Sequence, residues 1–93
     1  MIKMTKNGNK AWVTFTFSST ASVESVSLVG AWSQWKEEPM KRKKNGDYYI
    51  TKVLPIGNNF EFGYKVNENE WMQEEECTSV PSPFTSLNSL LTL

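Results

Sequence analysis

The chain has no histidine and only one cysteine, Cys77. Without histidine it lacks the usual general base, and the serine and cysteine triads and most zinc sites lose a required member. A single cysteine allows no disulfide within the chain, which fits a reducing compartment. We therefore expect a protein that is not an enzyme and has no metal and no cofactor. Cys77 is interpreted as a small packing or loop residue and not as a nucleophile.

Net charge and long apolar runs are also missing. Ten basic residues balance ten acidic ones, so no overall field gathers phosphates, and we expect no nucleic-acid partner. The basic cluster at residues 41–44 precedes Asn45-Gly46-Asp47, a hairpin-turn signal, and is interpreted as a solvated strand end. No window approaches the roughly 18 apolar residues of a membrane span, so we expect no membrane partner and a cytoplasmic location.

Two other chemistries find little support in the sequence. The five glycines, at positions 8, 30, 46, 57 and 63, are scattered and form no phosphate-binding loop. Carboxylates for glycoside hydrolysis are available, but no spacing singles out a pair. The short loops of a small β domain also rarely enclose a desolvated carboxyl. Catalysis is left as a minor alternative, and no catalytic residue is assigned.

What the chain does contain is aromatic residues in alternating segments. Its 93 residues, 13% of them aromatic, suit a single domain over 1–93 with a core over about 11–93. Apolar and polar residues alternate over 11–17, 22–29 and 60–66, which is typical of strands. Residues 48–54 are rich in aromatic and branched residues between two turn signals and are interpreted as a further strand, and 71–73 and 89–93 are interpreted as short strands. This pattern predicts an all-β fold, an immunoglobulin-like antiparallel β-sandwich. Residues 74–88 are expected to form a long ordered loop, held by Val80 and Phe84.

The stretch GAWSQW, residues 30–35, places two tryptophans three positions apart. A tryptophan can fill a core, or it can stand in solvent and offer a flat face to the apolar side of a sugar ring. Nearby amides and hydroxyls then take the polar rim of the sugar. Residue type alone leaves this choice open for each tryptophan, Trp12 included. The side chains of the right kind for a sugar site are Gln34, Trp35, Asn67, Asn69, Trp71, Ser86 and Asn88.

The order of several motifs is more specific than their composition. The run VSLVGAWSQW, residues 26–35, is followed by Pro39-Met40, Gly46, Leu54-Pro55, Gly57, the aromatic segment and Trp71. Over about Val13 to Leu93, this order resembles the glycogen- and starch-binding modules of the AMP-activated kinase beta subunit and the early-set domain ahead of isoamylases and branching enzymes. The tail, residues 80–89, is similar to small stand-alone bacterial proteins built from that early-set domain.

The resemblance implies a non-catalytic module that binds α-1,4-linked glucan, such as glycogen, starch or maltooligosaccharides. It implies that Trp32 belongs to the core, whereas Trp35 and Trp71 stack on glucose units. It further implies contacts to the sugar from side chains near the end of the chain and on the aromatic strand: Lys65, Phe84, Ser86 and Asn88.

The chain departs from the family pattern in two places. The lysine of the family's aromatic strand falls on Gly63, with Lys65 two positions later on the same face, and Asn67-Glu68-Asn69-Glu70 replaces the usual Asp-Gly turn. Either change can weaken sugar binding or abolish it. The resemblance also leaves an alternative function, because early-set domains often pack against a catalytic barrel. Trp35 would then be an interface residue that docks onto a carbohydrate-active enzyme or another protein.

Overall fold

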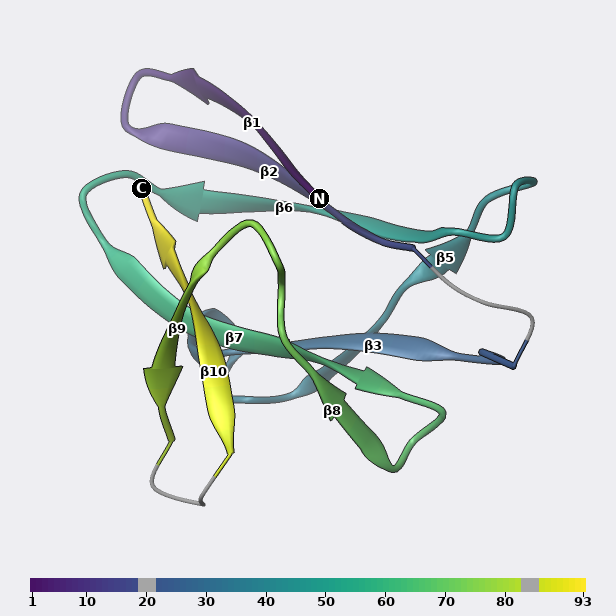
Figure 1. The fold of residues 1–93 in the computed structure, drawn as a ribbon. Coiled ribbons are helices and arrows are strands. Elements are labelled where there is room, and N and C mark those ends of the chain that lie inside the picture. Colours follow the sequence, from purple (N-terminus) through teal and green to yellow (C-terminus); the bar gives the residue numbers. More distant parts are fainter. Residues whose placement is uncertain (19–21, 83–85) are drawn as a thin grey trace.

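Two antiparallel sheets lie face to face in the computed structural model, which describes residues 1–18, 22–82 and 86–93 (Figure 1). The strands are β1 Ile2–Asn7, β2 Lys10–Phe17, β3 Val26–Gly30, β4 Glu37–Pro39, β5 Lys41–Arg42, β6 Tyr48–Pro55, β7 Asn59–Val66, β8 Glu70–Met72, β9 Thr78–Pro81 and β10 Leu87–Thr92. The four-stranded sheet has the order β1-β2-β6-β5, and the six-stranded sheet has the order β4-β3-β7-β10-β9, with β8 paired to β7. This architecture confirms the predicted immunoglobulin-like sandwich.

The core lies between the sheets and is built from the inward side of the alternating strands. Val13 and Phe15 on β2 are fully buried, as are Phe62 and, within 1%, Tyr64 on β7. The rings of Phe15 and Phe62 meet edge to face, with their centroids 5.2 Å apart. Such a pair adds about 0.5–1.5 kcal/mol beyond the burial of its area. Aromatic contacts across the sandwich therefore hold the two sheets together.

Strand alternation also defines the outer face of the six-stranded sheet. Because Phe62 and Tyr64 point inward, the same strand turns Glu61, Gly63 and Lys65 outward. Val29 of β3 lies opposite Gly63, and Trp71 of β8 lies opposite Lys65. Residues directly opposite one another share a face of the sheet. The outer face of this sheet thus brings together side chains from three strands.

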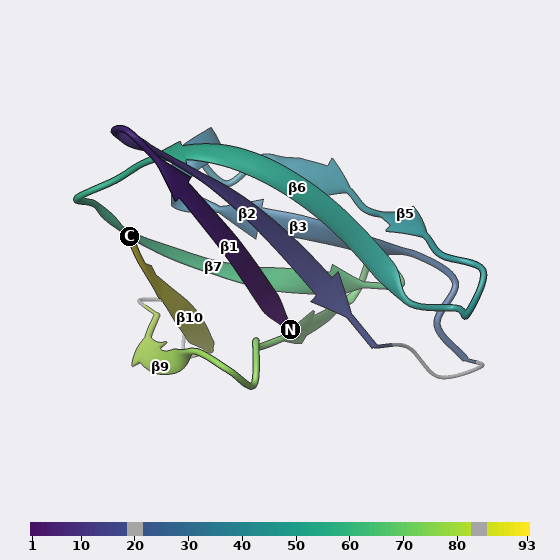
Figure 2. The same cartoon turned by 90° about the horizontal axis from the view of Figure 1, so that it is seen from above.

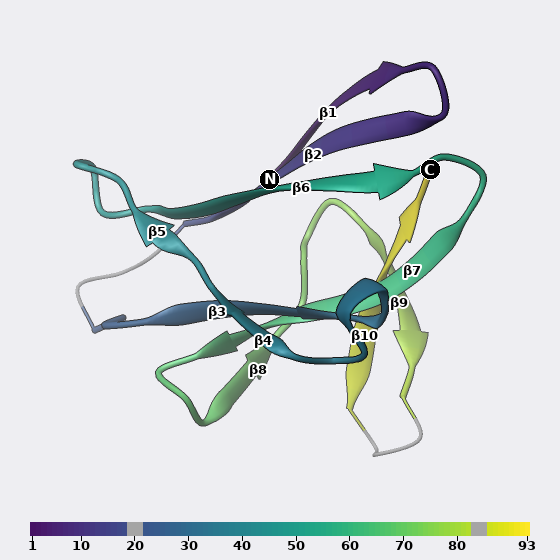
Figure 3. The same cartoon turned by 180° about the vertical axis from the view of Figure 1, so that it is seen from behind.

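The chain passes from one sheet to the other between β4 and β5. β4 pairs with β3 in the six-stranded sheet, whereas β5 pairs with β6 in the four-stranded one. Figure 3 shows this segment rising from the lower layer to the upper one. Met40, the residue between the two strands, is 8% exposed and packs in the core. Viewed from above, β1, β2 and β6 cover β3 and β7 (Figure 2).

Several hairpin turns use left-handed backbone conformations. The predicted turn at Asn45-Gly46-Asp47 is confirmed, since it joins β5 to β6 with Gly46 at φ 95°. Between β7 and β8, Asn67 and Glu68 have φ values of 51° and 65°. Two successive positive φ angles match the twist of a tight hairpin and normally favour Asn-Gly or Asp-Gly. Asn67 and Glu68 therefore adopt the turn conformation for which an Asp-Gly pair is better suited.

The structure corrects several strand predictions. Residues 74–88 are not a continuous loop, because Thr78–Pro81 forms β9 and pairs with β10. β3 begins at Val26, four residues later than its predicted start at 22. β1 was not predicted, because most of its residues are exposed and it shows no apolar alternation. Val80 is half-buried in β9, and the predicted role of Phe84 in holding this region lies outside the described residues.

Candidate functional site

The GAWSQW stretch forms a tight turn that sends its first tryptophan inward. Residues Ala31–Ser33 form a 3₁₀ turn after β3. Trp32 packs against Phe15, Phe60 and Phe62, with ring centroids 5.4, 5.9 and 5.8 Å apart. Its indole N–H donates to Glu38 Oε1 at 2.8 Å. Trp32 therefore packs against the core, as expected, although it is half-buried and not fully enclosed.

Gly30 makes room for the Trp32 ring. A Cβ atom on Gly30 would lie 2.5 Å from Cζ2 of Trp32, well inside carbon–carbon contact distance. Glu38, which holds the indole N–H, also forms an ion pair with Lys52 of the opposite sheet. Burial raises the pKa of Glu38, but hydrogen bonds from Lys52 and Trp32 outweigh it, so the pKa lies below its ordinary value. The turn is thereby tied to both sheets.

The second tryptophan of the stretch points to the opposite side. In a continued 3₁₀ helix, side chains three residues apart eclipse one another, so Trp35 would follow Trp32. Instead Gln34 and Trp35 have left-handed φ angles of 58° and 64°, and the backbone N–H of Trp35 donates to Gly30 O at 3.0 Å. Trp35 is 43% exposed. Left-handed backbone is unfavourable for a bulky residue, so the fold sustains local strain to hold this indole in solvent.

Trp35 and Trp71 lie on one open groove of about 270 Å³ on the outer face of the six-stranded sheet. We call it the tryptophan groove. Among the described residues it is lined by Val29, Trp35, Glu37, Lys65, Asn69, Glu70 and Trp71. The segment between the 3₁₀ turn and β4, together with β4, supplies one side of it, and the β7–β8 hairpin supplies the other. Residues far apart in the sequence thus present two indoles to the same space.

Trp71 is half-buried because the ring rests on the sheet. A Cβ atom on Gly63 would lie 2.2 Å from Cζ2 of Trp71. The indole N–H donates to the backbone oxygen of Leu87 on β10 at 2.9 Å. One face of the ring is therefore covered by β7, and its polar edge is fixed to the neighbouring strand. This leaves the ring as a supported platform.

A charged pair lies in the groove with the two indoles. Lys65 Nζ is 3.1 Å from Glu37 Oε2, and their side chains are 35% and 52% exposed. An exposed pair of this kind contributes about 0–1 kcal/mol to stability. Both groups keep free hydrogen-bonding capacity toward solvent or a bound polar molecule. Glu70 and Asn69, from the hairpin, add further acceptors and donors at the rim.

The remaining predicted site residues lie apart from the groove. Asn88 is 6% exposed, and its amide donates to Glu61 Oε1 at 3.2 Å on the side of Gly63 away from Lys65. Ser86 is half-buried and does not belong to the described lining of the groove. Phe84 lies outside the described residues. The structure brings together Trp35, Lys65 and Trp71, and it leaves Asn88 next to Leu87, the residue that accepts the Trp71 hydrogen bond, with the Asn88 amide engaged by Glu61.

Three residues of the lining were not predicted from the sequence: Val29, Glu37 and Glu70. Glu37 and Val29 are a cross-strand pair of β4 and β3. A three-residue strand with an exposed, acidic pattern gives no periodic signal. The one available signal was the GAWSQW turn. It reverses the chain so that β4 pairs with β3, which places Glu37 opposite Val29 on the same face of the sheet.

Charge is unevenly divided between the two sheets. Every basic residue except Lys36 and Lys65 lies on the four-stranded sheet or on its β5–β6 turn. Every acidic residue except Asp47 lies on the six-stranded sheet or on the loops that lead to it. The net charge of zero therefore conceals a separation of charge. The groove lies on the acidic side, whose field disfavours anionic ligands and tolerates neutral ones.

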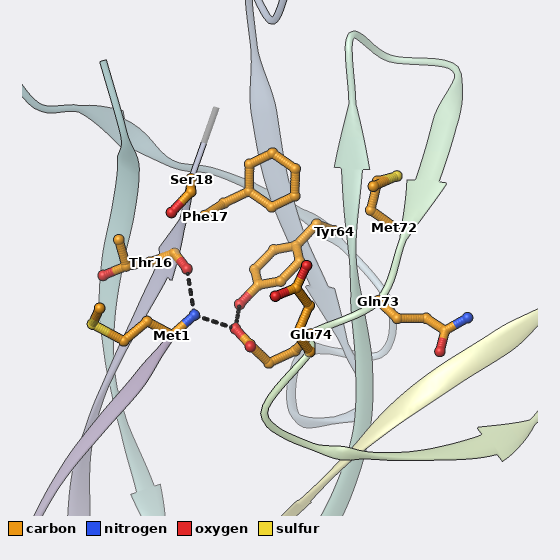
Figure 4. Close-up of a pocket in the computed structure, with 9 residues that line it drawn as sticks. Met1, Thr16, Phe17, Ser18, Tyr64, Met72, Gln73 and Glu74 are labelled. Carbon is orange, nitrogen blue, oxygen red and sulfur yellow. Dashed lines mark hydrogen bonds and ion pairs between the residues drawn. The ribbon is translucent and has the colours of Figure 1, made fainter. Parts of the chain in front are cut away.

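A second, smaller cavity of about 140 Å³ lies near Met1, between the ends of the two sheets (Figure 4). Its central group is Glu74, whose side chain is 3% exposed and ion-paired at 2.7 Å with the Met1 amino group. Tyr64 donates its hydroxyl to the same carboxylate at 2.8 Å, and the backbone N–H of Glu76 donates to Oε2 at 2.9 Å. The Met1 amino group and the Tyr64 hydroxyl thus both bond to the Glu74 carboxylate, which indicates a structural role for this cluster.

The ionisation of this cluster follows from the same contacts. Burial raises the pKa of Glu74, but the hydrogen bonds from the Met1 amino group, Glu76 and Tyr64 outweigh it, and the pKa lies below its ordinary value of 4.5. Burial and the Glu74 carboxylate raise the pKa of the Tyr64 hydroxyl. Burial also raises the pKa of the Cys77 thiol, which packs against the core. A raised pKa keeps that thiol protonated and unreactive at neutral pH.

No family model matches the chain, and no curated protein matches it. Across the part of the chain that the structure describes, no helix has the length and apolar character needed to cross a membrane. Any functional assignment therefore depends on the geometry of the site and on the sequence motifs.

Proposed function

We propose that this protein is a non-catalytic α-glucan-binding module that holds α-1,4-linked glucose units in the tryptophan groove. The observation that carries the proposal is that Trp35 and Trp71, distant in sequence, line one open groove together with Lys65. An exposed indole matches the apolar C–H face of a glucose ring. Two indoles on one groove suit successive units of a single chain.

The polar lining completes the match to a sugar. The carboxylates of Glu37 and Glu70, the ammonium of Lys65 and the amide of Asn69 surround the two rings. A glucose unit presents hydroxyls around its rim, and each hydroxyl can donate and accept. A neutral glucan also suits the acidic side of the molecule better than a phosphorylated ligand does. Asn88 and Ser86 are proposed as contacts of a longer glucan that extends past Trp71.

The resemblance supports the same ligand and adds its linkage. It matches Trp35 and Trp71 to the stacking pair of glycogen- and starch-binding modules, in which the natural curl of an α-1,4 chain follows two angled rings. We accordingly propose a cytoplasmic protein that binds glycogen-like polymers without cleaving them. Because an open groove leaves much of the sugar hydrated, affinity in the range of roughly micromolar to millimolar is expected.

Titration with maltoheptaose and β-cyclodextrin, read by calorimetry, tests the proposal. Saturable binding is expected, and cellohexaose, whose β-1,4 chain is straight, should bind at least about tenfold more weakly, a difference of roughly 1.4 kcal/mol. Trp35→Ala and Trp71→Ala should each weaken binding by tenfold or more, which is about the cost of removing a stacking anchor.

Trp12→Ala is the matched control for these variants. Trp12 is 41% exposed, close to the 43% of Trp35, but it lies on the four-stranded sheet. Its removal should leave glucan binding unchanged. Binding that survives in both Trp35→Ala and Trp71→Ala would contradict the assignment of the site. No binding at millimolar sugar would contradict the proposed function and favour docking of the exposed indoles onto another protein.

A further inference from the structure

The ring of Trp71, on β8, rests on the backbone of Gly63, which lies on β7 across the hairpin. Figure 1 shows the ribbons of β7 and β8 side by side. A Cβ atom on Gly63 would lie 2.2 Å from Cζ2, 2.5 Å from Cε2 and 2.8 Å from Cη2 of the indole. Carbon atoms in contact normally stay about 3.5–4.0 Å apart. Any side chain at position 63 would therefore occupy space that the ring now fills.

The three distances also define how the ring approaches. Cζ2 is nearest, and the two ring atoms bonded to it are only 0.3 and 0.6 Å farther away. An edge-on approach would place those neighbours much farther off than the nearest atom. The indole thus presents its face, and not its edge, to Gly63. The opposite face is the one available to a ligand.

The backbone at Gly63 does not itself require glycine. Gly8, Gly46 and Gly57 have positive φ angles, whereas Gly63 does not and lies inside β7, opposite Val29. Glycine inside a strand normally weakens it, and it often marks a close approach of another group. The space taken by Trp71 is the reason for glycine at this position.

We propose that Gly63 is a positioning residue of the tryptophan groove. Its missing side chain seats Trp71 against the sheet, while the hydrogen bond from the indole N–H to Leu87 O fixes the rotation of the ring. The absence of a side chain at Gly63, which we call the seat, sets the distance of the Trp71 ring from the sheet. It thereby sets the separation between Trp71 and the sugar units held at Trp35. The sugar-related part of this inference rests on the proposed function.

The inference opposes what the family resemblance suggests for this position. If glycine here only deprived the groove of a lysine that binds sugar, Gly63→Lys would strengthen glucan binding. If Gly63 is a seat, the lysine displaces the ring, and Gly63→Lys and Gly63→Ala should both weaken maltoheptaose binding by about tenfold or more. Lys65, two residues along the same face, already supplies an ammonium group to the groove.

Nuclear magnetic resonance of the sugar-free protein tests the seat directly. In the wild type, the indole ring should shift an Hα signal of Gly63 upfield, and nuclear Overhauser cross-peaks should join that proton to the Trp71 ring. Gly63→Ala should abolish these cross-peaks and shift the Trp71 indole N–H signal, because the ring leaves Leu87. Wild-type spectra without any cross-peak between residues 63 and 71 would overturn the inference, whatever the sugar result.

The change in Tm caused by Gly63→Ala, measured with Trp71 present and with Trp71→Ala, adds a second test. A glycine that only served the strand would give the same change in both. In the Trp71→Ala background the seat is empty, so Gly63→Ala should raise Tm by about 2–8 °C, the gain expected for alanine over glycine inside a strand of a domain this size. In the wild-type background the same change should lower Tm or leave it unchanged. An equal decrease in both backgrounds would overturn the proposal.

The sugar titration separates this inference from the proposed function. If Gly63→Ala stays folded, shows no cross-peaks between residue 63 and the Trp71 ring, and no longer binds maltoheptaose, the positioning role is supported. Full binding in Gly63→Ala despite a displaced ring overturns it. A wild type that shows the cross-peaks between Gly63 and Trp71 but binds no maltoheptaose contradicts the proposed function and removes the sugar role of Gly63. The packing of Trp71 on Gly63 is then still supported.

Discussion

Replacing each tryptophan of the GAWSQW turn by alanine should have opposite effects on stability and on binding. Trp32 contacts three aromatic rings, those of the buried Phe15 and Phe62 and of the half-buried Phe60, at centroid distances of 5.4–5.9 Å, and it donates a hydrogen bond to Glu38. Truncation of a core tryptophan costs about 3–5 kcal/mol. Because Trp32 is half-buried and not fully buried, we expect the lower end, about 3 kcal/mol.

The matching change at Trp35 should cost little. This side chain is 43% exposed, and alanine would occupy the same left-handed backbone, so the conformational strain is unchanged. Exposed substitutions of this kind usually alter stability by no more than about 0.5 kcal/mol. For a domain of 93 residues, a loss of 3 kcal/mol lowers Tm by about 12–24 °C, whereas 0.5 kcal/mol lowers it by about 2–4 °C.

Urea unfolding followed by far-ultraviolet circular dichroism measures the difference. Trp32→Ala should shift the midpoint strongly at an unchanged slope, and Trp35→Ala should leave the midpoint almost unchanged. Glucan binding should behave in the reverse sense at a temperature where both variants are folded. Comparable stability losses in the two variants would refute the division of this turn into a core side and a ligand side.

Further predictions concern the buried carboxylate, the second glycine seat and the charge of the groove. Because the pKa of Glu74 is lowered in the folded state, its ionised form stabilises the protein above about pH 4.5, and this contribution is lost as the pH falls through the folded pKa. Glu74→Gln should therefore lower Tm at pH 7 and reduce the further loss of Tm on acidification. A variant whose Tm depends on pH as the wild type's does would contradict this. Gly30→Ala makes the same chemical change as Gly63→Ala but displaces a core ring, so it should lower Tm by many degrees, and a neutral result in thermal scans would contradict the packing described for Trp32. Lys65→Met should weaken maltoheptaose binding severalfold in calorimetry without altering the fold, and unchanged affinity would remove Lys65 from the site. A maltooligosaccharide that carries a phosphate should bind more weakly than its neutral counterpart, and tighter binding would contradict the acidic character of the groove side.

The strands that could be predicted from the sequence are those whose two faces meet different surroundings. β2 and β7 alternate between core and solvent, so Val13, Phe15 and Phe62 produce a clear period of two. β1 has almost no buried residue and hence no such pattern. Among the described residues β9 pairs only with β10, and it follows an acidic run, so its existence depends on a tertiary pairing that no local signal reports.

The candidate site was predictable only in part, for a similar reason. The motif order indicated Trp35 and Trp71, and the alternation of β7 placed Lys65 on the outer face. That Gly63 serves a tryptophan on the next strand could not be predicted, because this relation needs the register of the β7–β8 hairpin. Nor does composition reveal the separation of charge, since it depends on which strand joins which sheet.

The most direct test of the central claim is a maltoheptaose titration followed by the indole N–H signals in a ¹H–¹⁵N correlation spectrum. The chain has four tryptophans, which give separate indole reporters for the groove, the core and the opposite sheet. The signals of Trp35 and Trp71 should shift together along one binding curve, while those of Trp12 and Trp32 stay in place. Shifts confined to Trp12, or no shift at any indole up to millimolar sugar, would contradict the claim that the tryptophan groove binds glucan.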